Sequence, residues 1–237
     1  MKVHIIQHDP CVGPGEYLNW AVRRRHDVSV TRCWMHDELP READADLLIL
    51  LGGWQSPVTT KAECDYFDSD AEQKLIRQFA DAGRAVVSVC LGAQLVSNAM
   101  GAPYGHSPER EIGAVKARLT EAGKADPFLK QFPDVFEAGQ WHRDMPGVNE
   151  YAVILAESDG CPRQIVRYGR YIYGFQTHME FTHEIIAAVL KDIGGELKVK
   201  GRFVQTTEEL LAYDHTEMNR LLSTLLDALA EDYEGRE

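Results

Sequence analysis

Residues 85–95 read AVVSVCLGAQL, an apolar, β-branched strand pattern that passes through a cysteine between small residues directly into a helix pattern. The spacing Ser88-x-Cys90-x-Gly92 is typical of a nucleophile elbow, in which small neighbours permit a sharp turn and leave the reactive atom exposed above a parallel sheet. A cysteine at the N-terminus of a helix also feels the positive end of the helix dipole, which favours the thiolate. Cys90 is therefore a candidate nucleophile. The alternative interpretation is a core cysteine at a strand end, because cysteine is among the most buried residue types.

Strand and helix patterns alternate throughout the N-terminal half. Short apolar runs occupy residues 3–6, 28–31, 46–51 and 84–89, and helical patterns fill residues 16–25, 69–82 and 91–100. This order indicates βα units around a mostly parallel sheet, which is an α/β fold. The motif Ser69-x-x-Glu72 predicts a capping box at the start of the second helix, and Gly83 predicts its end.

The C-terminal half contains more strand patterns before it becomes helical. Strands are expected at residues 114–119, 135–138, 151–156, 164–168 and 171–176, and helices at 182–193 and over much of 207–233. Leucines recur at helical spacing in the last segment, which favours a packing helix, although such a helix could also build a dimer. Because no repeat, low-complexity tract or linker divides the chain, we expect a single domain over residues 1–237 with the helix at about 207–233 appended.

Charge and composition limit the partners and the compartment. The net charge of −12 over 237 residues disfavours nucleic acid and anionic membrane surfaces as partners. The N-terminal residues lack the apolar stretch of a signal peptide, and no run is long enough to cross a bilayer. Neither a disulfide framework nor a zinc site is indicated by the odd number and wide spacing of the cysteines, which are Cys11, Cys33, Cys64, Cys90 and Cys161. We therefore expect a cytoplasmic protein.

Most histidines give no pattern for metal binding. We expect neither a metal site nor a cofactor, because no metal-ligand spacing connects His4, His8, His26, His36, His106, His183 and His215.

Residues 171–180, YIYGFQTHME, contain a candidate base for the cysteine. A cysteine nucleophile needs a base and a group that orients it. Side chains two apart on a strand share a face, so Glu180 could accept a hydrogen bond from one ring nitrogen of His178 while the other nitrogen faces Cys90. The alternative is a polar strand end before a helix, with Glu180 placed to complement the helix dipole.

Residues 47–54, LLILLGGW, form an apolar strand that ends in a glycine pair. Glycine lets the backbone approach a ligand closely, so the N–H of Gly53, with that of Leu91, could hold an oxyanion. An ordinary turn is the alternative interpretation of the glycine pair.

Taken in order, these motifs resemble a known family. The set of residues 51–53 (LGG), 89–94 (VCLGAQ) and 178–180 (HME) is similar to the class I glutamine amidotransferases, most closely to the stand-alone branch similar to the amidotransferase domain of GMP synthase. The resemblance extends from the first strand to the helix after Glu180. It also includes residues 111–113 (EIG), 140–144 (QWHRD) and 161–164 (CPRQ).

The resemblance implies a flavodoxin-like three-layer sandwich with a Cys-His-Glu triad. Cys90 would attack the γ-carbonyl of glutamine to form a γ-glutamyl thioester, while the N–H groups of Gly53 and Leu91 hold the oxyanion. His178 would protonate departing ammonia and activate water, and Glu180 would hold its tautomer.

The resemblance also implies that Gln94 and the backbone near His142 and Arg143 hold the amino-acid end of the substrate. Three positions differ from the family pattern: Ser88 replaces a glycine, Ala93 a frequent histidine, and Met179 a common proline. None of the three is a triad position, but together they mean that the resemblance does not fix glutamine as the substrate.

Three functions therefore stay open. The first is a glutaminase that either supplies ammonia to a separate synthase subunit or releases it, since the chain shows no ATP-binding or synthase module. The second is a stand-alone hydrolase for a larger γ-glutamyl compound. The third is a non-catalytic or redox relative, in which a thiolate-prone Cys90 is oxidised or binds a ligand.

Overall fold

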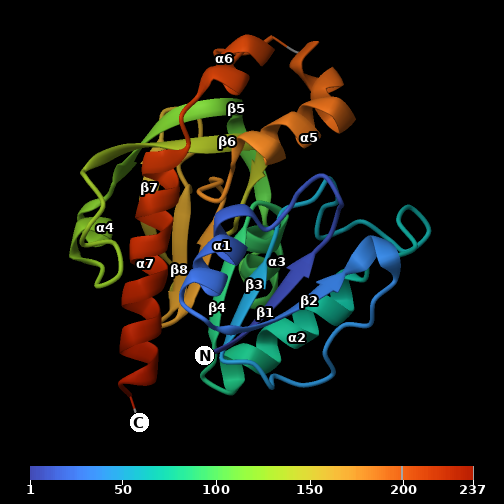
Figure 1. Cartoon of the computed structure of the whole chain (residues 1–237), viewed down its shortest axis with the longest axis vertical. Coiled ribbons are helices and arrows are strands. Elements are labelled where there is room, and N and C mark those ends of the chain that lie inside the picture. Colours follow the sequence, from blue (N-terminus) through green and yellow to red (C-terminus); the bar gives the residue numbers. More distant parts are fainter. Residues whose placement is uncertain (199, 237) are drawn as a thin grey trace.

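A ten-stranded sheet forms the centre of the protein, which a computed structural model describes over residues 1–198 and 200–236 (Figure 1). The strand order is β10-β5-β7-β8-β9-β4-β3-β1-β2, and β6 pairs with β5 outside this path. The strands are β1 (Lys2–Gln7), β2 (Asp27–Arg32), β3 (Leu47–Leu50), β4 (Ala85–Val89), β5 (Gly105–Leu119), β6 (Val135–Met145), β7 (Val153–Ser158), β8 (Ile165–Gly169), β9 (Ile172–Phe175) and β10 (Phe203–Val204).

Helices cover both faces of this sheet. They are α1 (Gly15–Arg23), α2 (Ser69–Asp81), α3 (Leu91–Ala99), α4 (Glu121–Ala125), α5 (His183–Ile193), α6 (Thr207–Ala212) and α7 (Thr216–Glu234). Successive side chains of a strand point to opposite faces. Accordingly, Leu47 and Ile49 of β3 pack in one core cluster with α1 and α7, while Leu48 and Leu50 pack in another with α2 and α3. The prediction of a three-layer α/β fold is confirmed.

The parallel half of the sheet positions the candidate nucleophile. Strands β2, β1, β3, β4 and β9 pair in parallel, and every residue of β3 and β4 is buried. A strand that is covered on both faces has an almost continuous apolar sequence, as residues 47–50 and 85–89 have. Because β4 ends at Val89 and α3 begins at Leu91, Cys90 lies at the carboxyl edge of the sheet, where parallel α/β folds bind ligands.

The other half of the sheet is largely antiparallel and longer than predicted. The short strands expected at 114–119 and 135–138 are parts of β5 and β6, a hairpin with an irregularity between His106 and Glu111. Strand β7 also pairs antiparallel with β5 and β8, and β8 pairs antiparallel with β9. Residues 105–111 are mostly polar and have no apolar period, so distant partners in β6 and β10 define them as a strand.

The C-terminal helical segment is divided where one helix was expected. Helix α6 ends at Ala212 and α7 starts at Thr216, and between them the Asp214 carboxylate accepts a hydrogen bond from the Thr216 N–H (2.9 Å). The leucines of α7 pack into the core shared with α1, as expected for a packing helix. No helix among the described residues is long and apolar enough to cross a membrane.

The predicted capping box of α2 is wrong. The N-cap is Asp68, whose carboxylate accepts the Ala71 N–H at 3.0 Å. Ser69 donates its hydroxyl to the carbonyl of Pro57, and Glu72 turns inward to a histidine described below. The predicted helix end is close to the observed one: Gly83 follows α2 with φ +65°, the left-handed conformation that glycine adopts at low cost.

Candidate active site

Cys90 occupies a strained turn between β4 and α3. Its φ of 53° and ψ of −114° are unusual for a residue with a side chain, and such conformations cost about 1–3 kcal/mol. The Cys90 N–H donates to the Phe175 carbonyl at 2.7 Å, which fixes the turn to the end of β9. A methyl group on Gly92 would lie 2.5 Å from the Leu50 carbonyl oxygen, so only glycine lets α3 approach β3 this closely. Cys90 itself is 8% exposed.

His178 and Glu180 meet in an irregular segment after β9. The predicted strand through residue 176 ends at Phe175, so the shared-face argument for His178 and Glu180 does not apply. Instead, His178 forms an isolated bridge with Gly139 of β6, donating its N–H to that carbonyl at 2.7 Å. The His178 Nδ1 lies 2.6 Å from Glu180 Oε1, and the imidazole stacks on the Phe181 ring at 4.1 Å. Both side chains are buried, so their orientation is fixed.

The imidazole lies beside the cysteine. A methyl group on Gly52 would lie 3.2 Å from His178 Cε1 and 3.3 Å from Cys90 Cβ. The His178 Nε2 has no partner of standard hydrogen-bond geometry among the described residues, so the contact with the thiol is looser than that with Glu180. Burial disfavours the imidazolium, but the charge and hydrogen bond of Glu180, together with the neighbouring Cys90, raise the pKa of His178 to about 10. This balance favours the protonated ring.

A cavity of about 230 Å³ opens beside these groups. Cys90, His178 and Gln94 line it together with Gly53 and Leu91, the two residues expected to supply oxyanion donors. Leu91 is the first residue of α3, and the N–H groups of a first helical turn have no intrahelical partner. The structure thus brings the predicted nucleophile, base and oxyanion loop to one cavity.

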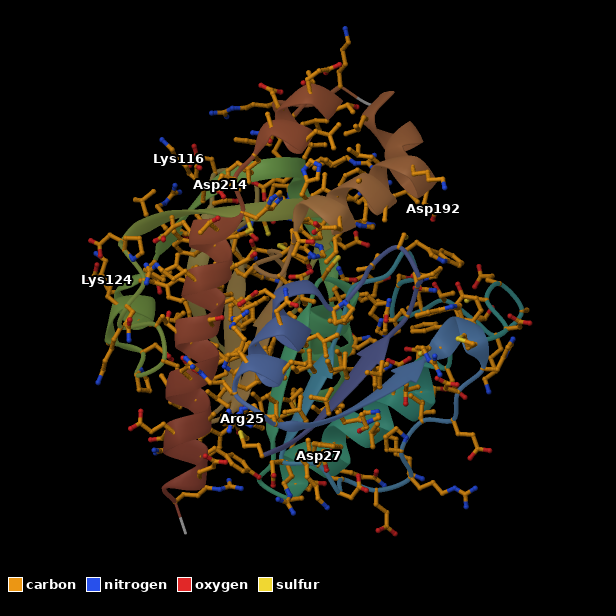
Figure 2. The ribbon with its side chains drawn as sticks, viewed as in Figure 1. Arg25, Asp27, Lys116, Lys124, Asp192 and Asp214 are labelled. Atoms are coloured by element: carbon orange, nitrogen blue, oxygen red, sulfur yellow. The ribbon has the colours of Figure 1, made fainter. Side chains whose placement is uncertain are left out.

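The rim of the cavity carries charges of both signs. Asp192 lines it together with Arg110 and Arg143, whereas Asp9, which also lines the cavity, is buried. Figure 2 shows Asp192 near the C-terminal end of α5, where its carboxylate accepts a weak hydrogen bond from the Cys11 thiol at 3.5 Å. A small zwitterion is the kind of ligand that such a mixed rim suits.

The residues expected to bind substrate, Gln94, His142 and Arg143, all line this cavity. Gln94 is buried and donates its amide to Gln176 Oε1 at 3.1 Å. Arg143 is exposed at the cavity, whereas His142 is buried with its Nε2 3.2 Å from Glu111 Oε2. Neither ring nitrogen of His142 makes a hydrogen bond of standard geometry among the described residues, so Glu111 is a close neighbour of the ring rather than a hydrogen-bond partner.

Glu111 is the centre of a buried polar cluster that the sequence patterns did not predict. The carboxylate is fully buried and accepts hydrogen bonds from Ser158 Oγ at 2.7 Å and Gln164 Nε2 at 2.6 Å. The motifs EIG and CPRQ, at 111–113 and 161–164, contain two of its members, but nothing local indicates that they meet.

Two residues after β1 hold the glycine loop and were also missed. The Asp9 carboxylate accepts the Trp54 N–H at 3.3 Å and the Tyr66 hydroxyl at 2.9 Å. Its neighbour His8 places Nδ1 3.2 Å from the Gly52 carbonyl oxygen and Nε2 2.9 Å from Glu72 Oε2. A polar residue just after a parallel strand is the available signal, because ligands bind at that edge of the sheet.

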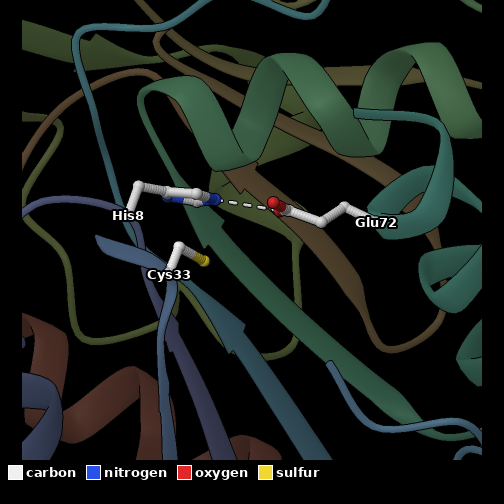
Figure 3. Close-up of side chains that lie close together, drawn as sticks. All are labelled: His8, Cys33 and Glu72. Carbon is white, nitrogen blue, oxygen red and sulfur yellow. Dashed lines mark hydrogen bonds and ion pairs between the residues drawn. The ribbon is translucent and has the colours of Figure 1, made fainter. Parts of the chain in front are cut away.

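His8 is therefore not an isolated histidine, contrary to the scattered pattern in the sequence. His8, Cys33 and Glu72 are all buried, and their potential ligand atoms lie within 4.8 Å of one another (Figure 3). The dashed line in Figure 3 marks the contact between His8 and Glu72, and the Cys33 thiol lies beside it.

Comparison with known proteins places these features in a family. The model of the family described as glutamine amidotransferase class-I matches residues 17–193. The glutamine amidotransferase-like protein YfeJ of Salmonella typhimurium is 45% identical over 232 residues, covering 97% of each chain. A glutamine-hydrolysing GMP synthase subunit of Methanocaldococcus jannaschii is 32% identical over 100 residues, 41% of this chain and 52% of the archaeal one. The crystal structure of SMU.1228c has a TM-score of 0.94 and 46% identity, covering 97% of this chain and 100% of the other.

Proposed function

Because the chain belongs to the class I glutamine amidotransferase family, we propose that it hydrolyses a γ-glutamyl amide, converting glutamine to glutamate and ammonia through a γ-glutamyl thioester on Cys90. The observation that carries the proposal is the meeting of Cys90 with His178 at one cavity, with Glu180 2.6 Å behind the imidazole. A nucleophile, a base and a group that orients the base are the requirements of covalent acyl transfer.

In the proposed reaction, the Cys90 thiolate attacks the γ-carbonyl carbon, and the carbonyl electrons move onto oxygen. The N–H groups of Gly53 and Leu91 donate hydrogen bonds to that oxyanion. The His178 imidazolium then gives its Nε2 proton to the leaving nitrogen, so the C–N bond breaks and ammonia departs. Water next loses a proton to neutral His178 while its oxygen attacks the thioester. The C–S bond breaks, and glutamate and the original thiolate–imidazolium pair result.

We assign substrate binding to Gln94 and to the backbone near His142 and Arg143. Gln94, His142 and Arg143 all line the cavity that also contains Cys90. The charges at the rim suit the ammonium and carboxylate of an amino acid.

The fate of the ammonia belongs to the same proposal. One relative is itself a subunit of a glutamine-hydrolysing GMP synthase, so a separate synthase chain is a reasonable acceptor for ammonia. Five free cysteines support a reducing compartment, and we keep a cytoplasmic location as part of the proposal.

A second candidate is a hydrolase for a larger γ-glutamyl amine or peptide. Trp54 lines the cavity and is 57% exposed, which is unusual for a tryptophan. An exposed aromatic at the mouth of a cavity could cover a substituent on the γ-nitrogen. The departures from the family pattern at Ser88, Ala93 and Met179 are compatible with a substrate other than glutamine.

The test is hydrolysis of glutamine and of a panel of γ-glutamyl amides by the wild type, Cys90→Ala and Cys161→Ala. Cys161 is buried away from the cavity and serves as the matched thiol control. We expect Cys90→Ala to abolish turnover and Cys161→Ala to retain it. Mass spectrometry after incubation with a diazo-ketone analogue of glutamine should show one adduct, on Cys90. Unchanged turnover in Cys90→Ala would refute the proposal, and an unmodified Cys90 in an inactive protein would favour the non-catalytic or redox relative.

A further inference from the structure

Resting on the proposed function, we infer that His8 and Glu72 are positioning residues that lock the Gly52–Gly53 peptide, so that the Gly53 N–H faces the Cys90 thiol. Neither side chain lines the cavity or touches a reacting group. They act through the backbone of the glycine loop.

The direction of the hydrogen bond is fixed by chemistry. A carbonyl oxygen only accepts, so His8 Nδ1, 3.2 Å from Gly52 O, must carry a proton and donate it. Glu72 faces the other ring nitrogen at 2.9 Å and keeps the ring in that state. Burial opposes protonation of His8, but the Glu72 carboxylate outweighs it and raises the pKa of His8 above its ordinary value.

The carbonyl contact controls the neighbouring N–H. In a trans peptide, the carbonyl oxygen of one residue and the N–H of the next point in opposite directions, and the described residues include no cis peptide bond. When the Gly52 carbonyl oxygen points toward His8, the Gly53 N–H therefore points away from His8. Gly53 lines the cavity with Cys90, and a methyl group on Gly52 would lie within 3.3 Å of Cys90 Cβ.

A glycine pair needs such a lock. Glycine adopts both signs of φ readily, so a Gly-Gly peptide reorients at low cost. The next residue after His8 supplies a second hold, because the Asp9 carboxylate accepts the Trp54 N–H at 3.3 Å. The loop is thus held on both sides of Gly53 by consecutive residues at the end of β1.

The burial of this pair also favours a functional role. His8 and Glu72 are 0% and 1% exposed, and a buried ionic pair is often no more stabilising than apolar residues of similar volume. Glu72 would gain more solvation in the first turn of α2 if it faced water. Cys33 completes the pocket as a neutral thiol, because burial raises its pKa far above the ordinary value.

The test compares His8→Phe, His8→Asn and Glu72→Gln with His4→Phe. His4 is a buried histidine of β1, the strand that precedes His8, and it bonds to Ser29 and Thr31 outside the cavity. Phenylalanine keeps the ring but loses the donor, whereas the asparagine amide reaches the position of Nδ1. We expect kcat to fall about 10- to 100-fold in His8→Phe with KM within about twofold, and to fall by a smaller factor in Glu72→Gln, where His8 keeps its ring. His8→Asn should recover part of the loss, and His4→Phe should show no change.

A second readout separates positioning from general damage. Alkylation of Cys90 by iodoacetamide passes through no oxyanion, so its rate should stay within about twofold of the wild type in His8→Phe. A kcat that is unaffected in His8→Phe, or a parallel loss of kcat and alkylation rate, would overturn the inference.

Nuclear magnetic resonance tests the inference even if the wild type hydrolyses no γ-glutamyl amide, an outcome that would refute the proposed function alone. The ¹⁵N shift of His8 should show a protonated Nδ1. The Gly53 amide resonance should move in His8→Phe but not in His4→Phe. An unprotonated Nδ1, or one equivalent of zinc held by His8, Cys33 and Glu72 in the purified protein, would contradict the lock.

Discussion

The carboxylate of Glu180 decides the charge of His178. Burial alone would lower the pKa of an imidazole, and the rise to about 10 comes from Glu180 together with Cys90. The folded pKa lies above the unfolded value of 6.5. The protonated ring therefore contributes its full stabilisation below about pH 6.5, and this contribution is lost as the pH rises through about 10.

Replacement of Glu180 by Gln should reverse this balance. We expect the pKa of His178 to fall below that in the wild type and kcat to drop at least about 100-fold, because a neutral ring cannot protonate the leaving nitrogen. A pH titration of the His178 Cε1 proton measures the pKa. Thermal unfolding between pH 7 and 10 should lose less stability in Glu180→Gln than in the wild type. An unchanged titration would contradict this account.

Some residues of the candidate site could be predicted from the sequence and others could not. Cys90 was identifiable because its strand, turn and helix are adjacent in the chain. His8 and Glu72 lie 64 positions apart, and the local pattern around Glu72 indicated a capping box. Only the packing of α2 against the end of β1 turns that carboxylate inward.

Among the secondary-structure elements, the contact of α3 with β3 sets the elbow. A Cβ on Gly92 would meet the Leu50 carbonyl oxygen at 2.5 Å, and backbone cannot yield as a flexible side chain can. We expect Gly92→Ala to lower the free energy of unfolding by about 1–3 kcal/mol.

The control for this prediction is Gly105→Ala at the start of β5, where nothing lies within 4 Å of a new Cβ. That variant should remain within about 0.5 kcal/mol of the wild type in urea unfolding. Equal effects of the two substitutions would show that α3 is free to move away from β3.

The elements that sequence patterns located well are the buried, parallel ones. Residues 47–50 and 85–89 are apolar because helices cover both faces, and their strands match the prediction within two residues. The hairpin of β5 and β6 was underestimated because half of β5 is polar and the partners of that half in β6 lie 31 to 40 positions away in the sequence. The break before α7 spans only the three residues between Ala212 and Thr216, a signal too short to interrupt a leucine pattern.

Across the whole molecule, α7 connects distant parts of the chain. Its Asp227 pairs with Arg24 next to α1, and its Asp232 pairs with Arg170 between β8 and β9. These exposed pairs contribute little individually. The leucines of α7 contribute more, because Leu225 and its neighbours are fully buried in the core that also contains β1, β3 and α1.

We therefore propose that residues 1–237 form one domain and that α7 is an integral part of it. Leu225→Ala should lower the free energy of unfolding by about 2–5 kcal/mol, because it leaves a cavity in the shared core. Urea unfolding followed by tryptophan fluorescence and by far-ultraviolet circular dichroism should give one coincident transition in both wild type and variant. If α7 were an appended element, the variant would instead lose helical signal in a separate, earlier transition while the sheet and the Cys90 cavity stayed folded.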